Sequence, residues 1–265
     1  MSPGSPEDAA WRAILDRVPG RTGAKSGNVS PAGAGSQSGI ESLWQIYLPL
    51  ASCETLAIAQ LGQTLDGYIA TRTGHSRYVT GPEDIRHLHR LRALVDAVVV
   101  GAGTIAADDP LLTVRKVVGP SPVRVILDPS GRVDPRARVF RNAEARTLWL
   151  RSARRAPSVP APPSVETVAL EEREEDGFAP ADILRLLAER GLPRVLIEGG
   201  GITVSRFLAA GVLDRLHVTV APVVLGSGRA SLTLPPVDRL DQALRPRCRY
   251  FPLGNDMLFD LDLRP

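Results

Sequence analysis

Cysteine is scarce in this sequence, and its scarcity excludes several classes of protein. Two cysteines, Cys53 and Cys248, are too few for a disulfide framework or a cysteine-rich metal site. Residues 1–10 lack the basic start and the apolar stretch of a secretory signal. No apolar run approaches the roughly 18 residues that a membrane helix needs. We therefore expect a reducing, cytoplasmic setting and no membrane partner.

The signatures of metal sites and of serine hydrolases are also missing. The histidines are dispersed, and His87 and His89, two positions apart, would point to different faces of a helix. No Gly-x-Ser-x-Gly elbow presents a serine nucleophile. These absences lead us to expect neither a bound metal ion nor triad chemistry.

Aromatic residues make up only 5% of the chain, and they are not interleaved with the basic residues. The net charge is +3, with arginine far commoner than lysine, but the arginines are scattered along the sequence. A nucleic-acid surface would gather them. Arginine also makes bidentate contacts with phosphate groups, so small phosphorylated ligands fit this composition better.

The chain divides into an extension, residues 1–50, and a compact domain, residues 51–265. The extension combines a short amphipathic helix over residues 6–18 with a Gly- and Ser-rich segment, residues 20–39, which reads as a flexible linker. A further short helix over residues 42–50 would cover the start of the domain.

Within the domain, short apolar runs alternate with amphipathic segments, which predicts an α/β fold with a mostly parallel sheet. The final strands are candidates for antiparallel pairing. Thr80 and Glu83 form a capping-box pattern before a helix that starts at Pro82. We expect the main strands over residues 56–61, 97–100, 123–127, 147–150, 165–170, 195–197, 215–220 and 258–263.

Three consecutive glycines follow the strand at residues 195–197, and a helix over residues 202–210 follows them. Glu198 stands at the strand end, directly before Gly199, Gly200 and Gly201. Without Cβ atoms, the backbone N–H groups can approach an anion, and the helix N-terminus favours negative charge. The pattern indicates either a phosphate site or a tight strand-to-helix turn.

A second glycine pattern, Gly101 to Ala106, matches the Gly-x-Gly-x-x-Ala dinucleotide fingerprint, with Asp128 placed like a ribose-binding acid. An ordinary Rossmann unit needs a longer helix than this segment allows, because Asp108-Asp109-Pro110 interrupts it. A variant loop that lines a cofactor stays open. The two aspartates are either an acid/base pair or, more commonly, a turn-shaping pair.

Several segments, taken in order and spacing, resemble one family. The chain is similar to the reductase domain of the bifunctional riboflavin-biosynthesis deaminase–reductase over about residues 56–263. This resemblance implies a dihydrofolate reductase-like, three-layer α/β/α fold. The segments are Gln63-Thr64-Leu65-Asp66-Gly67, Gly74 to Thr80, Leu91-Arg92-Ala93, Gly103-Thr104, Ala107 to Arg115, Ile197 to Gly201 and Ala221 to Gly226.

The resemblance implies an enzyme that uses NADPH to reduce the ribosyl group of 5-amino-6-(5-phosphoribosylamino)uracil to a ribityl chain, as a homodimer. Asp108 and Glu198 are the ionisable groups to test first for catalysis. The implied NADPH contacts are Gly62, Tyr78, Thr104, Asp108, Gly200, Gly201, Ile202, Thr203, Val204, Ser205 and Arg206. The implied substrate contacts are Ser76, Arg92, Leu112, Arg115 and Glu198.

Arg92 and Arg115 suit an anionic phosphate. Arg151, Arg154 and Arg155 are candidates for the 2′-phosphate of NADPH, or they form a solvated basic turn.

Two departures from the family matter. Gln60 stands where the family often has lysine, and no zinc-deaminase signature is present. The sequence therefore leaves open a reductase of another heterocycle, such as dihydrofolate, and a nucleotide-binding relative without turnover.

Overall fold

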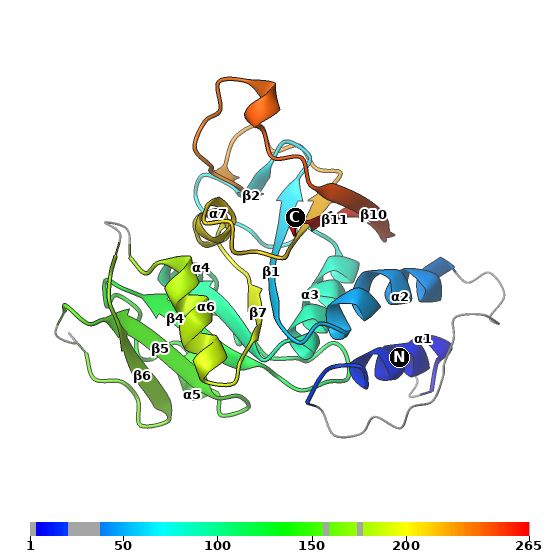
Figure 1. The fold of residues 1–265 in the computed structure, drawn as a ribbon. Helices are drawn as coiled ribbons and strands as arrows, with labels where there is room; N and C mark the ends of the chain where they lie inside the picture. The colour runs from blue at the N-terminus through cyan, green and yellow to red at the C-terminus, as the bar shows by residue number, and fades with distance from the viewer. Residues whose placement is uncertain (1–3, 21–37, 156–158, 174–176, 265) are drawn as a thin grey trace.

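The computed structural model describes residues 4–20, 38–155, 159–173 and 177–264. Within these residues, nine strands form one sheet in the order β10-β11-β8-β1-β7-β3-β4-β5-β6 (Figure 1). The strands from β8 to β6 in that order run parallel, while β11 is antiparallel to β8 and β10 is antiparallel to β11. The predicted α/β class and the antiparallel final strands are confirmed.

The element bounds agree with the expected alternation of strands and helices. The strands of the main sheet are β1 Leu56–Thr64, β3 Ala97–Gly101, β4 Val123–Asp128, β5 Thr147–Ser152, β6 Val165–Leu170, β7 Arg194–Ile197, β8 Arg215–Ala221, β10 Arg247–Leu253 and β11 Asp256–Asp262. A small second sheet pairs β2 Tyr68–Ala70 with β9 Arg229–Ala230. The helices are α1 Pro6–Leu15, α2 Ser38–Ala51, α3 Pro82–Leu94, α4 Ala102–Asp108, α5 Arg138–Arg141, α6 Pro180–Glu189, α7 Gly201–Ala209 and the short 3₁₀ turn η1 Leu240–Gln242.

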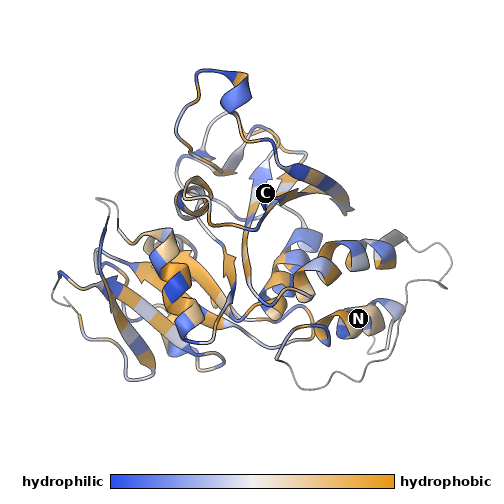
Figure 2. Cartoon of the chain, viewed as in Figure 1, coloured by the Kyte–Doolittle hydropathy of each residue, from blue (hydrophilic) through white to orange (hydrophobic). Residues whose placement is uncertain are grey.

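Alternate residues of each central strand enter two separate hydrophobic cores. Val98 and Val100 of β3 pack in the core that includes α1, α2 and α3. Ala97 and Val99 pack in the opposite core, with residues of α6 and α7. Side chains alternate across a strand, so a sheet buried on both faces reads as a continuous apolar run. Figure 2 shows these strands in orange. The three-layer α/β/α arrangement expected from the family is confirmed.

The two N-terminal helices pack against the compact domain. Trp11 of α1 donates its indole N–H to the carbonyl of Val118 at 2.7 Å and contacts the Tyr47 ring of α2 edge-on. Helix α2 begins earlier than residue 42. The expected linker over residues 20–39 falls almost wholly on 21–37, outside the described residues. No helix in the described segments is long and apolar enough to cross a membrane.

The expected capping box at α3 is wrong. Gly81 is the N-cap and makes no side-chain cap hydrogen bond. The Thr80 hydroxyl instead donates to Asp84 at 2.7 Å, and Glu83 pairs with Arg86. A buried carboxylate needs hydrogen-bond donors from the protein because water is excluded from it. The Thr80 hydroxyl therefore donates to Asp84 and does not cap the helix.

The order of the strands in the sheet favours a ligand site at one edge. β1 lies between β8 and β7, and β7 lies beside β3, so strands distant in sequence end at the same edge of the sheet. Open α/β sheets bind ligands outside the carboxyl ends of such strands. The missed strand β10 lies at the far edge, where charged residues and Pro252 hide its strand pattern.

Candidate active site

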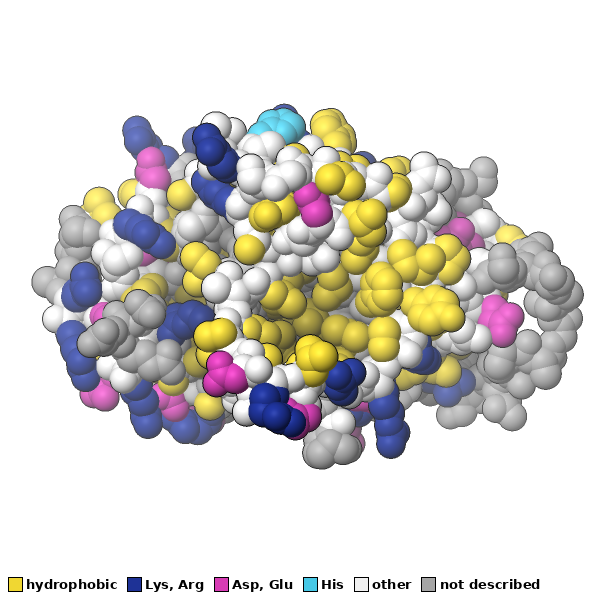
Figure 3. Space-filling view, turned by 90° about the horizontal axis from the view of Figure 1, so that it is seen from above, with side chains coloured by type: hydrophobic (Ala, Val, Ile, Leu, Met, Phe, Trp, Pro, Cys, Tyr) yellow, Lys and Arg dark blue, Asp and Glu magenta, His cyan; other side chains and the backbone are white. Residues whose placement is uncertain are grey.

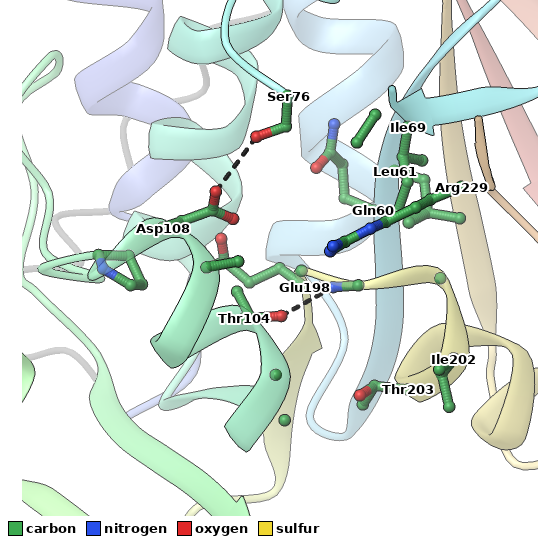
Figure 4. A pocket seen from close by; sticks show the side chains of 18 of the residues that line it. Gln60, Leu61, Ile69, Ser76, Thr104, Asp108, Glu198, Ile202, Thr203 and Arg229 are labelled. Atoms are coloured by element: carbon green, nitrogen blue, oxygen red, sulfur yellow. Dashed lines mark hydrogen bonds between the residues drawn. The ribbon is translucent and has the colours of Figure 1, made fainter. Parts of the chain in front are cut away.

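A cavity of about 760 Å³ opens at the carboxyl ends of β1, β3, β4 and β7, with walls from α3, α4 and α7. In the space-filling view, hydrophobic side chains gather in a central hollow, and arginine and lysine side chains lie around it (Figure 3). Polar groups enter the cavity at a few positions, as is typical of small-molecule sites. Figure 4 labels several of these polar residues, among them Gln60, Ser76 and Glu198.

The three glycines after β7 have three different structural roles. Gly199 has a φ of +93°, and a Cβ there would lie 2.5 Å from the Thr104 hydroxyl. Gly201 packs against the backbone of β9, where a Cβ would lie 2.3 Å from the carbonyl oxygen of Ser231. Only Gly200 faces space that a side chain could enter, so it is the glycine that leaves the backbone open to a ligand.

The two glycine loops of the chain interlock at the cavity. The Thr104 hydroxyl of α4 accepts a hydrogen bond from the Gly200 N–H at 2.9 Å (Figure 4). In return, Thr203 of α7 rests on Gly101, where a Cβ would lie 2.7 Å from its hydroxyl. Each loop therefore leaves room for a threonine from the other, and the two helix N-termini are held side by side.

The start of α7 has the geometry of an anion-binding site. Gly201 and Ile202 occupy its first two positions, whose N–H groups have no intrahelical acceptor. Arg206, one turn further along, lines the same cavity and donates to the carbonyl of Phe178. Arg132, in the loop after β4, lines it too. Helix N–H groups with nearby arginines favour a phosphorylated ligand here.

Arg92 and Glu198 form a buried ion pair in the cavity wall. The arginine Nε and Nη2 donate to the two carboxylate oxygens at 2.8 and 2.7 Å, and Nη1 donates to the carbonyl of Thr113. Arg92 is 6% exposed and Glu198 is 4% exposed. The bidentate contact neutralises both charges and fixes the orientation of the carboxylate at the end of β7.

Asp108 and Ser76 meet across the cavity. The Ser76 hydroxyl donates to Asp108 Oδ1 at 3.1 Å, as the dashed line in Figure 4 shows. The neighbouring Asp109 is the left-handed C-cap of α4 and accepts a hydrogen bond from the Arg138 N–H. Of the two aspartates, Asp109 therefore shapes the turn, and Asp108 faces the cavity.

A second buried carboxylate, Asp84, lies on the α3 side of the cavity. It accepts hydrogen bonds from Thr80, from Thr219 at 2.6 Å and from the Gln60 side-chain nitrogen at 3.1 Å. Burial raises the pKa of Asp84 above its ordinary value, and these hydrogen bonds oppose that rise. Sequence reasoning missed this residue, because nothing local distinguishes it from an ordinary acidic residue in a first helical turn.

The structure brings most of the expected contact residues to one cavity. Tyr78 is 87% exposed, Val204 and Ser205 face the protein interior, and none of the three lies in the cavity wall. The expected residues that do line the cavity are Gly62, Ser76, Arg92, Thr104, Asp108, Leu112, Glu198, Gly200, Gly201, Ile202, Thr203 and Arg206.

The other arginines expected to bind phosphate lie outside the cavity wall. Arg115 donates to the Thr113 hydroxyl at 2.6 Å. Arg151 stacks over Trp149 and donates to the carbonyl of Val159. Arg155 lies 3.5 Å from Glu172. Arg154 is exposed. Two arginines that sequence reasoning did not single out, Arg132 and Arg229, line the cavity instead.

The fold and the cavity define a reductase of the dihydrofolate reductase-like class. The chain belongs to the RibD C-terminal domain family, whose family model matches residues 56–250. The resemblance noted in the sequence is thereby confirmed.

Two relatives illustrate the match. The chain is 38% identical over 222 residues to the 2,5-diamino-6-ribosylamino-4(3H)-pyrimidinone 5′-phosphate reductase of Methanothermobacter thermautotrophicus, covering 78% of this chain and 97% of that one. It is 38% identical over 198 residues to the riboflavin biosynthesis protein RibD of Aquifex aeolicus, covering 74% of this chain and 54% of that one. The chain thus spans about half the length of that RibD protein.

Solved structures give the same fold. The bifunctional deaminase/5-amino-6-(5-phosphoribosylamino)uracil reductase of Thermotoga maritima matches with a TM-score of 0.68 and 28% identity, covering 84% of this chain and 61% of that one. The yeast reductase Rib7 matches with a TM-score of 0.67 and covers 98% of its own chain, but at 19% identity it supports the fold alone.

Proposed function

We propose that the protein is an NADPH-dependent reductase of riboflavin biosynthesis that converts the ribosyl group of a 5-amino-6-ribosylaminopyrimidine 5′-phosphate to a ribityl chain. The relatives' names support this reaction. The observation that carries the proposal is the meeting of an anion-binding helix start with the oriented Glu198 carboxylate in one cavity.

The residues at the α7 side of the cavity fit NADPH. The open backbone at Gly200 and the N–H groups of Gly201 and Ile202 would bind its pyrophosphate. Arg132 and Arg206 are the cavity-lining cations in reach of the 2′-phosphate end, a role for which Arg151, Arg154 and Arg155 are less well placed. When bound, NADPH would supply the hydride for C1′ of the opened, imine-like sugar, and the imine nitrogen would take up a proton.

The chain's own part is alignment and exclusion of water. Glu198, held by Arg92, would accept a hydrogen bond from a sugar hydroxyl or a ring N–H of the substrate. Ser76 and Asp108 would close the opposite side of the sugar. Arg229 points into the cavity in Figure 4, and no ion pair is recorded for it within the described residues, so it would bind a phosphate.

Turnover of NADPH tests the proposal. We expect absorbance of NADPH to fall when the protein meets either 5-amino-6-(5-phosphoribosylamino)uracil or its 2-amino counterpart, with a ribityl product identified by mass spectrometry. Glu198→Gln should lower kcat by about a hundredfold, because the neutral amide is a weaker acceptor and leaves Arg92 unpaired. Oxidation of NADPH only with dihydrofolate would replace this function by the other-heterocycle alternative, and tight NADPH binding without any turnover would favour a non-catalytic relative.

We also propose that the protein is a homodimer. The edge strand β10 and the segment before it carry exposed apolar side chains, among them Val237, Leu240, Leu244 and Tyr250. Unpaired strand edges and exposed apolar residues support association of identical chains. Sedimentation velocity should give twice the mass of the chain, and a single species at the monomer mass would rule out the dimer.

A further inference from the structure

One face of helix α3 lines the cavity, and two carboxylates, Asp84 and Glu198, lie along it in different environments. Asp84, Leu88 and Arg92 follow one another at four-residue spacing, and all three line the cavity. Arg92 at the far end neutralises Glu198. Asp84 is 5% exposed, and within the described residues it has no ion-pair partner.

Among the described residues, the hydrogen-bond donors to Asp84 are all neutral. Thr80 and Thr219 give hydroxyl hydrogens, and Gln60 gives an amide hydrogen. A buried carboxylate without a cation is costly, and the nearby Asp256 adds repulsion. The free-energy cost of this buried charge remains in the folded protein. A ligand that donates hydrogen bonds to Asp84 in the cavity would offset it.

Gln60 adds a second acceptor beside the carboxylate. Its nitrogen is the atom that donates to Asp84, so its oxygen is left to accept from elsewhere. Gln60 lines the cavity, and in Figure 4 its side chain extends from β1 toward Ser76. This corner of the cavity therefore offers acceptors to a ligand and would repel a carbonyl oxygen placed against it.

We propose that Asp84 and Gln60 are the specificity-determining residues that bind the 2-amino group and an adjacent ring N–H of the pyrimidinone, so that this chain selects a 2,5-diaminopyrimidinone over the corresponding uracil. The inference rests on the proposed function and adds which heterocycle the site takes. The two heterocycles differ at C2, where one carries an amino donor and the other a carbonyl acceptor. A site built of acceptors discriminates strongly between them, because the wrong ligand leaves a buried carboxylate facing an oxygen.

Binding to the protein saturated with NADP⁺ tests the inference without turnover, since the oxidised cofactor has no hydride to give. Calorimetry should show the 2-amino substrate binding at least about tenfold more tightly than the uracil. Asp84→Asn should weaken binding of the 2-amino substrate by at least about tenfold and change binding of the uracil by less than about threefold. Asp182→Asn is the matched control. It changes a buried aspartate that is paired with Arg173 and Arg185, and it should keep the wild-type ratio.

Gln60→Lys is a second variant, in case Asp84→Asn fails to fold. It places a cation beside the carboxylate and should erase the preference while circular dichroism stays unchanged. Equal wild-type affinities for both heterocycles, or an equal loss of both in Asp84→Asn, would overturn the inference.

The fate of NADPH is read separately, so the two proposals can fail independently. A preference without oxidation of NADPH removes the reductase function and leaves the specificity assignment. Oxidation of NADPH without a preference between the two heterocycles removes the specificity assignment and leaves the reductase function.

Discussion

The two strand–glycine–helix segments of this protein look alike in sequence and differ in structure. Gly101 to Asp108 follows β3, and Glu198 to Ala209 follows β7. The first has the better match to a dinucleotide fingerprint, yet its helix is only 7 residues long and ends in the left-handed Asp109. The second has the longer helix and the glycine that leaves the backbone open.

Glycine spacing alone therefore does not identify a phosphate loop. In the β3 segment, Gly101 makes room for Thr203, and Gly103 meets nothing within 4 Å. In the β7 segment, Gly199 and Gly201 are required by close contacts, and they aim the helix start at the cavity. One loop buttresses the other through Thr104, and substitutions can separate the two roles.

The largest effect is expected for Gly201→Ala, because its Cβ would meet backbone oxygens of Ala230 and Ser231 that cannot rotate away. The free energy of unfolding should fall by about 2–3 kcal/mol, as in overpacked cores. Gly103→Ala is the control in the other segment, where Ala should be neutral or stabilising by up to about 1 kcal/mol. Chemical denaturation measures both, and equal effects would erase the contrast between the loops.

A smaller effect on stability and a large one on ligand binding are expected for Gly200→Val. A Cβ at this position would make only an ordinary contact, 3.5 Å from the Thr104 hydroxyl, so the free energy of unfolding should fall by no more than about 1 kcal/mol. The Kd for NADPH should rise at least about tenfold, which corresponds to about 1.4 kcal/mol. Fluorescence titration of NADPH measures this. Unchanged affinity would show that the pyrophosphate lies elsewhere.

Thr104→Val tests the link between the loops. It removes the acceptor of the Gly200 N–H and should lower the free energy of unfolding by about 1 kcal/mol. Thr203→Val is the counterpart. The Thr203 hydroxyl makes no hydrogen bond within the described residues, so this substitution should leave the free energy of unfolding nearly unchanged. Thermal unfolding of both variants decides whether the support runs from α4 to α7, and a neutral Thr104→Val would contradict it.

The smallest effect concerns Asp84, on the α3 side of the cavity. Burial raises its pKa above the ordinary value of 3.8, so its contribution to stability is full below that value and is lost as pH rises through the folded-state pKa. The stability of Asp84→Asn relative to wild type should therefore increase between about pH 3.5 and about pH 7.

Asp260→Asn supplies the opposite sign. Burial alone would raise the pKa of Asp260, but His217, Arg249 and Arg215 together hold it below its ordinary value. Its contribution is full above the unfolded-state pKa of 3.8 and is lost as pH falls, so the stability of this variant relative to wild type should increase as pH falls below about pH 5. Parallel slopes for the two variants, from urea denaturation at each pH, would contradict the opposite environments.

Much of the fold could be predicted because each central strand is an apolar run between turn signals. The capping box at Thr80 was wrong because the Thr80 hydroxyl donates to Asp84, a carboxylate that the folded protein buries. Strand β10 was missed because most of its residues are exposed and because it contains a proline. Most expected contact residues line the cavity, but their contacts on a ligand stay predictions.

The class of protein, the order of the central strands, and the segment that delivers Glu198 and three glycines to one strand end could be read from the sequence. The pairing of Arg92 with Glu198, the approach of Arg132 and Arg229 to the cavity, and the burial of Asp84 without an ion-pair partner among the described residues emerge only in the folded structure. The reason is physical. Periodicity and turn chemistry act over a few residues, whereas burial and charge pairing depend on groups brought together from distant parts of the chain.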